Sequence, residues 1–220
     1  MGKFGAFDII GPRMIGPSSS HTAGAARLAN LAWRIAGCDA VYARITLYGS
    51  FAETGRGHGT DKALVAGLLG MESDDDRLRF SMLLAETAGL KVDFVFSSDE
   101  REYANSVKIE IESSTGEKTT VEGASIGGGN VLILGINDMP VSLSGEYPAV
   151  IVHYEDSPGV INKVSALIAE ENINIAFMRV FRKGKNTEAS MVIETDTRVP
   201  RRVAAKIAEL SDKIYEVRVI

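Results

Sequence analysis

Apolar and polar residues follow two different periods in the first part of the chain. Residues 41–48 alternate apolar and polar side chains, which is typical of a β-strand with one buried face. Residues 23–36 repeat apolar side chains every three to four positions, which predicts a helix with Ser20 or Thr22 as its N-cap. The glycine-rich stretch 49–59 is predicted to be a loop that leads to a second apolar helix.

The middle of the chain is predicted to hold a further helix and then a run of strands. The helix begins at the acidic residues 74–76, which suit a positive helix N-terminus, and it ends near Gly89. Four short strand-like stretches follow, with a turn at the glycines 127–129 before the last one. These predicted strands are 91–96, 106–112, 118–123 and 130–136.

A new pattern begins near Pro148. The predicted elements from there follow the order β-α-β-β-α-β, which is the ferredoxin-like plan. The strands are predicted at 149–154, 174–182, 188–195 and 213–219, and the helices after Pro158-Gly159 and over 200–210. The sequence therefore predicts two domains, 1–147 and 148–220, of mixed α/β and α+β class.

Composition and charge exclude several classes of protein. The chain has 220 residues, a net charge of −5 and no run of lysine or arginine, so nucleic acid is not an expected partner. No apolar stretch approaches the roughly 20 residues of a membrane helix, so no membrane span is expected. Asp8, Gly11 and Pro12 interrupt the N-terminal stretch, unlike a signal peptide, and we expect a cytoplasmic protein.

The chain contains a single cysteine, Cys38. It cannot form an internal disulfide, which agrees with a reducing compartment. It also cannot hold an iron–sulfur cluster by itself, because several thiolates usually share that task. Cys38 follows an apolar helix, so we predict that it is a small buried hydrophobic residue.

A first candidate site lies just before the first predicted helix, where Ser18, Ser19, Ser20 and Thr22 surround His21. The free N–H groups and the dipole of a helix N-terminus favour an anion such as a carboxylate. A histidine beside that anion could transfer a proton at neutral pH. The alternative is an N-capping cluster with an exposed histidine, and the chemistry alone supports the two interpretations equally.

A second candidate site has the same construction, since His58 stands among glycines before Gly59, Thr60 and Asp61 at a predicted helix start. Glycine lets a ligand approach the backbone closely. The alternative is a plain flexible loop. Asp61 is either a helix cap or an orienting partner of a histidine, and the cap is favoured. The spacing of the glycines fits neither a P-loop nor a dinucleotide fingerprint.

Other catalytic classes find no support in the sequence. The three histidines and one cysteine do not pair at zinc-site spacing, so no metal site is expected in this chain. No Gly-x-Ser-x-Gly elbow is present, which argues against a serine hydrolase. No lysine is singled out as an anchor for pyridoxal phosphate.

Five motifs follow one another across the first domain. They are Phe7-Asp8-Ile9-Ile10-Gly11-Pro12, Gly16-Pro17-Ser18-Ser19-Ser20-His21-Thr22-Ala23-Gly24, Tyr48-Gly49-Ser50-Phe51-Ala52, Gly57-His58-Gly59-Thr60-Asp61 and Ser125-Ile126-Gly127-Gly128-Gly129. This series resembles the β subunit, or β domain, of iron–sulfur-dependent L-serine dehydratases. One departure is visible: where that family often has His-Pro-Asn-Thr, this chain has Tyr103-Ala104-Asn105-Ser106.

The resemblance implies an L-serine ammonia-lyase that forms pyruvate and ammonia. It implies a [4Fe–4S] cluster that is ligated by a cysteine-bearing α subunit and whose open iron acts as a Lewis acid on the substrate hydroxyl. This chain would supply the substrate pocket, with His21 and His58 as the candidates for proton transfer. The residues expected to bind L-serine are Ser18, Ser19, Ser20, Thr22, Gly59, Thr60 and Asp61. Which histidine is the base stays open.

The second domain resembles the ACT fold, a module that senses small molecules, through residues 153–160 and 173–175. By position, Asp156, Gly159 and Asn174 match effector contacts of similar domains. The resemblance implies that L-serine also binds as an effector between two copies of the domain, in a homodimer. The alternative is a dimerisation domain without a ligand.

The alternative to an enzyme is a regulatory protein without catalytic activity. The first domain also resembles the allosteric substrate-binding domain of some phosphoglycerate dehydrogenases, so the chain could be a non-catalytic, amino-acid-binding regulatory subunit. The presence of both His21 and His58 favours the enzyme.

Overall fold

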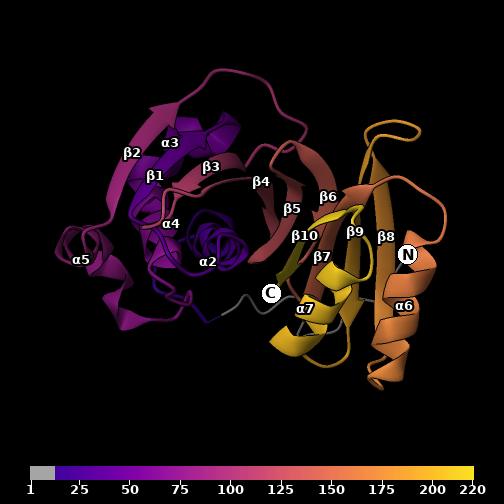
Figure 1. The fold of residues 1–220 in the computed structure, drawn as a ribbon. Helices are drawn as coiled ribbons and strands as arrows, with labels where there is room; N and C mark the ends of the chain where they lie inside the picture. Colours follow the sequence, from indigo (N-terminus) through magenta and orange to yellow (C-terminus); the bar gives the residue numbers. More distant parts are fainter. Residues whose placement is uncertain (1–12) are drawn as a thin grey trace, which may run out of the picture. The chain divides into compact units, whose positions relative to one another are not determined.

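The computed structural model describes residues 13–220, so the first of the five motifs, residues 7–12, lies outside the described residues. The chain divides into two compact units, Met1–Ile133 and Leu134–Ile220 (Figure 1). None of the helices found between residues 13 and 220 is both long and apolar enough to cross a lipid bilayer.

The first unit combines helices with most of a mixed sheet. Its helical segments are η1 (Ser19–Gly24), α2 (Ala25–Ile35), α3 (Gly49–His58), α4 (Thr60–Leu68), η2 (Asp76–Phe80) and α5 (Ser81–Ala88). Its strands are β1 (Tyr42–Leu47), β2 (Lys91–Phe96), β3 (Ser106–Glu112), β4 (Lys118–Gly127) and β5 (Asn130–Ile136). The sheet has the order β2-β1-β3-β4-β5-β6, in which β1 and β2 are parallel and β1, β3 and β4 are antiparallel neighbours.

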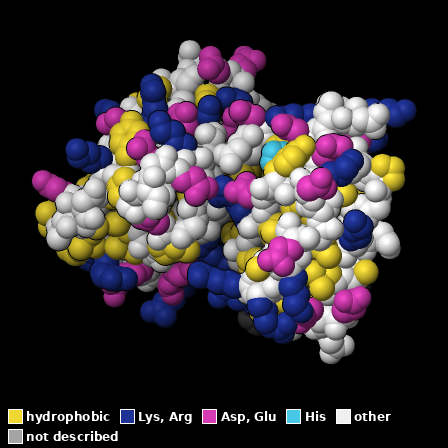
Figure 2. Space-filling view, viewed as in Figure 1, with side chains coloured by type: hydrophobic (Ala, Val, Ile, Leu, Met, Phe, Trp, Pro, Cys, Tyr) yellow, Lys and Arg dark blue, Asp and Glu magenta, His cyan; other side chains and the backbone are white. Residues whose placement is uncertain are grey.

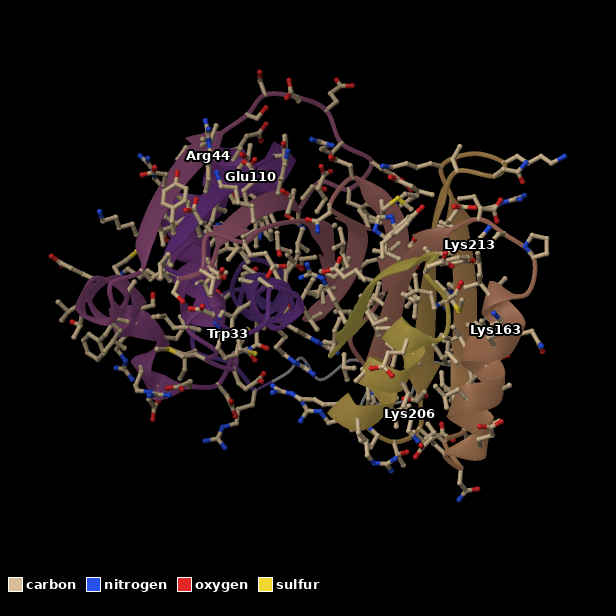
Figure 3. The ribbon with its side chains drawn as sticks, viewed as in Figure 1. Trp33, Arg44, Glu110, Lys163, Lys206 and Lys213 are labelled. Carbon is tan, nitrogen blue, oxygen red and sulfur yellow. The ribbon has the colours of Figure 1, made fainter. Side chains whose placement is uncertain are left out.

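The alternation in β1 divides the sheet into a buried and a polar face. Ala43, Ile45 and Leu47 are buried, because α2 and α3 pack on this side of the sheet. The residues between them point to the other face, where Arg44 lies opposite Glu110 of β3 (Figure 3). The strand predicted from the hydrophobic pattern is confirmed.

The helices α2 and α4 pack in very close contact at Gly67. A Cβ atom at this position would lie 2.3 Å from the carbonyl oxygen of Ala26, so only glycine fits there without displacing one of the helices. Asn30, one turn further along α2, donates a hydrogen bond through Nδ2 to the carbonyl of Met71, 3.3 Å away, just after the C-terminal end of α4. Ala26 contacts Gly67, and Asn30, further along α2, contacts Met71, which is further along the sequence from α4. The two helices are therefore parallel, and they begin at the same end of the unit.

The prediction of a loop over 49–59 is wrong, because most of this stretch forms the helix α3. Phe51 is fully buried and holds the helix on the core, and this packing outweighs the weak helix propensity of the glycines. Gly59 has φ +70° and ends α3 in the left-handed conformation, and it is also the N-cap position of α4. His58 is therefore the last residue of a helix and does not lie in a loop.

The helix expected from the acidic residues 74–76 is divided into two segments. The first, η2, is a 3₁₀ helix capped by Asp75, whose carboxylate accepts a hydrogen bond from the Arg77 N–H at 2.9 Å. The second is α5, and Gly89 ends it with φ +77°, as predicted.

The second unit contains the ferredoxin-like fold, which confirms the predicted fold class. Its elements are β6 (Met139–Leu143), β7 (Ala149–Glu155), α6 (Val160–Glu170), β8 (Ile175–Arg182), β9 (Glu188–Thr195), α7 (Arg201–Glu209) and β10 (Ile214–Val219). The sheet order β10-β7-β9-β8 places β7 and β9, the first and third strands of the ferredoxin-like fold, in the centre. Apolar side chains of α6 and α7 form one core with Val152, Tyr154 and Met191 of these central strands.

Strand β6 is not predicted by the hydrophobic pattern. Asn137 and Asp138 separate it from β5, and both have positive φ, 48° and 63°, as a two-residue hairpin turn requires. β6 packs against β8 and β9, and Ser190 Oγ donates a hydrogen bond to the Pro140 carbonyl at 2.8 Å. Because of this packing, the second compact unit begins before residue 148. The domain division at 147/148 stays a prediction.

We expect Gly67→Ala to lower the free energy of unfolding of the first unit by about 1–3 kcal/mol, because the added methyl group forces α2 and α4 apart. Gly57→Ala is the matched control, since nothing lies within 4 Å of its added Cβ in α3. This change should raise the stability by about 0.5–1 kcal/mol.

Urea unfolding followed by the fluorescence of Trp33, the single tryptophan of the chain, measures both effects. Trp33 lies on α2 and packs on Gly70, so it reports on this unit (Figure 3). Equal stabilities for Gly67→Ala and the wild type would contradict the close helix contact.

Candidate functional site

The serine-rich motif forms the first turn of a continuous helix. Ser18 is its N-cap, because Ser18 Oγ accepts a hydrogen bond from the His21 N–H at 3.1 Å. The prediction of Ser20 or Thr22 as N-cap is therefore wrong. The six residues of η1 have π-helical bonding, a wider turn that is frequent at functional sites.

Two glycines fix the position of this turn. Gly16 has φ +144°, and a Cβ there would lie 2.5 Å from the side chain of Thr22. A Cβ at Gly24 would lie 2.1 Å from Ser125 Oγ, so Gly24 lets β4 approach the turn. These contacts explain why the motif ends on a glycine, and they place Ser125 against the end of the same turn.

The start of α3 is held by the segment that departs from the family pattern. Ser50 N–H donates to the Ala104 carbonyl at 2.7 Å, and Tyr48 N–H donates to the Ser106 carbonyl at 3.1 Å. Gly49 has φ +50°, and a Cβ there would lie 2.5 Å from the Ala104 carbonyl oxygen. The backbone of this segment therefore orients α3 even though the family's histidine is absent.

The structure brings the two predicted histidines together. The rings of His21 and His58 are 4.8 Å apart between centroids. The ring of His21 also packs edge-on against Phe51 at 5.2 Å, and Thr22 Oγ1 donates to the His58 carbonyl at 3.3 Å. His21, Thr22 and His58 thus form one cluster at the common end of α2 and α4.

Two hydroxyl groups that the sequence analysis did not select complete this cluster. His21 Nε2 lies 3.2 Å from Ser50 Oγ and 3.1 Å from Thr54 Oγ1. Ser50 lies in one of the quoted family motifs, and Thr54 follows it by one helical turn. Their role depends on α3 being a helix, which the glycine content of the stretch concealed.

The hydrogen bonds assign the proton of each neutral imidazole. Thr54 Oγ1 donates its one proton to the Ser50 carbonyl at 2.9 Å, so its oxygen accepts from His21 Nε2–H. His58 Nδ1 lies 3.1 Å from the Thr54 carbonyl, which accepts only, so Nδ1 carries the proton there. His58 Nε2 is then the atom with the lone pair, and no side chain among residues 13–220 hydrogen-bonds to it.

The surroundings of His21 favour its neutral form. Burial lowers the pKa of His21 below its ordinary value of 6.5, a backbone hydrogen bond to Ser50 offsets part of this, and the nearby His58 charge lowers it further. The site therefore holds an uncharged imidazole at neutral pH, bonded to two hydroxyls.

The remaining predicted substrate residues occupy different environments. Ser19 and Ser20 belong to η1 beside the histidines, and Gly59 joins α3 to α4. Thr60 is fully buried, and its Oγ1 has no hydrogen-bond partner within the described chain. Asp61 Oδ1 accepts from the Lys62 N–H at 2.8 Å within the first turn of α4. The N-cap position of α4 is Gly59 and no side chain caps it, so the favoured role of Asp61 as the helix cap is wrong.

The three predicted effector residues do not lie together in one copy of the chain. Asp156 and Gly159 lie where β7 ends and α6 begins, whereas Asn174 lies at the other end of α6, before β8. Asp156 Oδ2 accepts hydrogen bonds from the Asn186 N–H and from Arg182, both at 3.1 Å, and these partners lower the pKa of its carboxyl. Asn174 Nδ2 donates to Asp196 Oδ2 at 2.7 Å.

The described residues of this chain do not form a ligand set for a metal ion or an iron–sulfur cluster. Between residues 13 and 220, no three His, Cys, Asp or Glu side chains gather closely enough to hold a metal. Cys38 has φ +64° and is exposed after the end of α2, so the prediction that it is buried is wrong. The turn that follows α2 carries its side chain outward, although the preceding helix is apolar.

Comparison with known proteins finds a different family for each of two parts of the chain. Residues 6–88 match the model of the serine dehydratase beta chain, and residues 149–212 match the ACT domain. The chain is 41% identical over 197 residues to the L-serine dehydratase beta chain of Peptoniphilus asaccharolyticus, which covers 89% of each chain. It is 38% identical over 213 residues to the probable L-serine dehydratase beta chain of Bacillus subtilis, with 97% of this chain and 96% of that protein covered.

A more distant similarity concerns a different enzyme. The D-3-phosphoglycerate dehydrogenase of Methanocaldococcus jannaschii is 36% identical over 124 residues, which are 56% of this chain and 23% of that protein.

The fold and the histidine cluster define a chain with an N-terminal site-bearing unit and a C-terminal ACT domain. With two relatives above 30% identity that match over almost their whole length, the chain belongs to the serine dehydratase beta-chain family.

We expect the imidazole of His21 to titrate below pH 6.5, because burial disfavours its charged form. Between the folded pKa and 6.5 the unfolded chain binds more protons, so His21 adds stability that is present above 6.5 and is lost as the pH falls through this window. His58→Gln should raise the pKa of His21, because the protonated form of His58 disfavours a second positive charge on His21.

Proton NMR titration of the histidine ring signals in the full chain measures these values, with His21→Gln identifying the signal. A His21 pKa above 6.5, or one that falls in His58→Gln, would contradict the assigned surroundings.

Proposed function

We propose that this chain is the β subunit of a [4Fe–4S]-dependent L-serine dehydratase, which converts L-serine to pyruvate and ammonia together with a cysteine-bearing α subunit. The observation that carries the proposal is the His21–His58 pair at the start of two parallel helices, in a chain whose relatives are L-serine dehydratase beta chains. Because this chain has one exposed cysteine, the cluster in this proposal belongs to the α subunit.

The first turn of the η1–α2 helix is suited to the substrate carboxylate. The N–H groups of Ser19 and Ser20 precede the first helical hydrogen bond, and the hydroxyls of the same two residues lie in this turn. Ser18 is occupied as the N-cap, so in this proposal it orients the turn rather than the substrate. The carboxylate would then lie beside the two imidazoles.

We assign the role of general base to His58. Its Nδ1–H is held by the Thr54 carbonyl, which leaves Nε2 with its lone pair available to take the α-proton of serine. His21 positions the site, since its Nε2–H is bonded to Thr54 and its neutral state avoids a positive charge beside the base. Loss of the α-proton and of the β-hydroxyl gives aminoacrylate, which tautomerises and hydrolyses to pyruvate and ammonia.

The rival proposal, a non-catalytic regulatory subunit, is supported by the partial similarity to D-3-phosphoglycerate dehydrogenases. That similarity covers 56% of the chain and concerns an enzyme with different chemistry. The assigned protons of the two histidines favour a site for proton transfer, because a purely regulatory pocket needs no base.

The chain alone should form no pyruvate from L-serine, and co-expression with the α subunit under anaerobic conditions should give turnover. In that complex His58→Gln should lower kcat by about 10²-fold or more, because the proton acceptor is lost. Glu53→Gln is the matched control, since Glu53 is an exposed residue of the same helix.

A coupled pyruvate assay measures turnover, and the thermal unfolding curve shows whether each variant folds. Turnover by the chain without the α subunit would contradict the shared site. A complex in which His58→Gln turns over like the wild type would transfer the role of base to another residue.

We further propose that L-serine binds as an effector between two ACT domains of a homodimer. Asn174 directly precedes β8, and Asp156, at the end of β7, accepts a hydrogen bond from Arg182 at the other end of β8. β8 is an edge strand of the sheet with Phe177 and Val180 exposed on it. If two β8 strands pair antiparallel about a twofold axis, Asn174 of one copy lies beside Asp156 and Gly159 of the other. This arrangement explains why one copy separates residues that are expected to share a ligand.

Isothermal titration of the full chain with L-serine should therefore give binding that Asn174→Ala weakens by about tenfold or more. Lys163→Ala, an exposed change on α6, is the control (Figure 3). Absence of binding up to millimolar serine by a dimeric chain would reject the effector role, and binding by a monomer would reject the shared site.

A further inference from the structure

Three side-chain oxygens of the first unit are buried without a hydrogen-bond partner among residues 13–220. They are Thr60 Oγ1, Asn105 Oδ1 and Ser125 Oγ. A buried polar group that stays unpaired costs stability, so folded proteins contain few of them. Two of the three lie side by side, which indicates a place where something else supplies the missing hydrogen bonds.

Asn105 and Ser125 are neighbours on the face of the sheet that the helices cover. The Ser125 N–H donates to the Asn105 carbonyl at 3.0 Å, which continues the pairing of β3 with β4 by one residue. Residues opposite each other in such a pair point to the same face of the sheet. Asn105 stands two positions before the buried Val107, so this is the face on which η1, α2 and α3 pack.

The contacts of this pair lead to the histidine cluster from two sides. A Cβ at Gly24 would lie 2.1 Å from Ser125 Oγ, so the hydroxyl touches the turn η1 that carries His21. On the other side, the Ala104 carbonyl accepts from the Ser50 N–H at 2.7 Å. Ser50 Oγ in turn lies 3.2 Å from His21 Nε2. The unpaired oxygens therefore lie between η1 and the start of α3, the two segments that His21 connects.

The histidine cluster offers no negative charge to a ligand. The hydrogen-bond partners of its two imidazoles are hydroxyls and a backbone carbonyl, with no carboxylate of the described chain among them. Asp and Glu side chains are spread over the visible face of the protein, so this lack is local (Figure 2). A cationic group that binds beside the imidazoles must therefore donate its hydrogen bonds to neutral oxygens. An amide oxygen and a hydroxyl oxygen both accept such bonds.

We propose that Asn105 Oδ1 and Ser125 Oγ bind the α-ammonium group of an amino acid whose carboxylate lies at the first turn of η1. The Cβ position of Gly24 that meets Ser125 Oγ is also 3.5 Å from the carbonyl oxygen of Ser19, so this hydroxyl lies close to that turn. The proposal rests on the proposed function for its substrate, L-serine, and adds the recognition of the amino group.

Binding at both groups fixes the direction of the α-C–H bond, because the amino acid can then turn about one axis only. Holding this bond toward His58 Nε2 is the positioning that proton abstraction needs. A simple carboxylate offers no donor to the two oxygens and would leave them buried and unpaired. The site should therefore select amino acids over carboxylic acids of the same size.

L-Alanine and propionate test this selection, because they differ only in the ammonium group and have no β-hydroxyl to lose. Proton NMR of the His58 ring signal in the full chain measures the affinity for each, with His58→Gln identifying the signal. The wild type should bind L-alanine at least about tenfold more tightly than propionate, since hydrogen bonds to a charged group are strong.

Ser125→Ala removes one acceptor without removing a hydrogen bond of the fold. It should lower the preference for L-alanine by about tenfold, while the affinity for propionate stays within about twofold. The midpoint of urea unfolding should not fall, because Ser125 Oγ is unpaired in the described chain. Asn105→Leu, which keeps the size of the side chain and removes its acceptor, should lower the preference in the same way.

Ser113→Ala is the matched control. Ser113 is 9% exposed and follows the other end of β3, and its Oγ accepts a hydrogen bond from the Glu117 N–H at 3.1 Å. This variant should unfold at lower urea and keep the wild-type preference for L-alanine. In the complex with the α subunit, Ser125→Ala should raise KM for L-serine more than it lowers kcat, because it removes binding of the substrate.

The outcomes separate this proposal from the proposed function. A wild type without a preference for L-alanine, or a preference that survives both Ser125→Ala and Asn105→Leu, would reject the ammonium site and leave an ordered water as the partner of the two oxygens. Equal losses for both ligands in a destabilised Ser125→Ala would also reject it, because the hydroxyl would then support the fold. If the complex does not dehydrate serine but the chain prefers L-alanine through Ser125, the proposed function is rejected and the amino-acid site stands.

Discussion

The contact between α2 and α4 at Gly67 is the constraint on which the candidate site depends. The two helix backbones approach so closely that no side chain fits between them, and their contacts advance in the same direction. Parallel helices in register begin at the same end, so the turn that carries His21 and the residue that precedes α4, His58, are brought together. The positive ends of two helices thereby lie at one small region, next to the negative C-terminal end of α3. The unbonded N–H groups at the start of η1 favour an anionic ligand there. The histidines add proton transfer to a place that the backbone has already made suitable for a carboxylate.

Most helices and strands could be predicted from the sequence, because their apolar residues recur with a clear helical or strand spacing. The alternation in β1 and the helical spacing in α2 reflect burial on one side, and the structure confirms both. The stretch 49–59 shows the limit of this approach. Its glycines suggest a loop, but the burial of Phe51 and the backbone hydrogen bonds to residues 104–106 hold a helix there. Tertiary packing of this kind has no local signal.

The candidate site was predictable in its residues but not in its hydrogen bonds. The histidines and serines were selected because their side chains can bind and move protons. Ser50 and Thr54 were not selected as site residues, since their contact with His21 exists only if α3 is a helix. The proton positions on the two rings depend on the Ser50 and Thr54 carbonyls, and backbone acceptors of this kind cannot be identified from side-chain chemistry. The same limit applies to the effector residues, whose separation in space follows from the direction of α6.

The pairing of Asp156 has a consequence for the energetics of the ACT domain. Its carboxylate already accepts hydrogen bonds from Arg182 and from the backbone of Asn186, in the turn between β8 and β9. A cation that takes the position of Arg182 at Asp156 Oδ2 displaces a guanidinium, so association there is an exchange of partners in which most of the electrostatic gain cancels. The displaced partners belong to the hairpin 182–188, which would lose part of its anchoring. A ligand at Asp156 would thus release the turn between β8 and β9, which lies about 30 residues further along the chain.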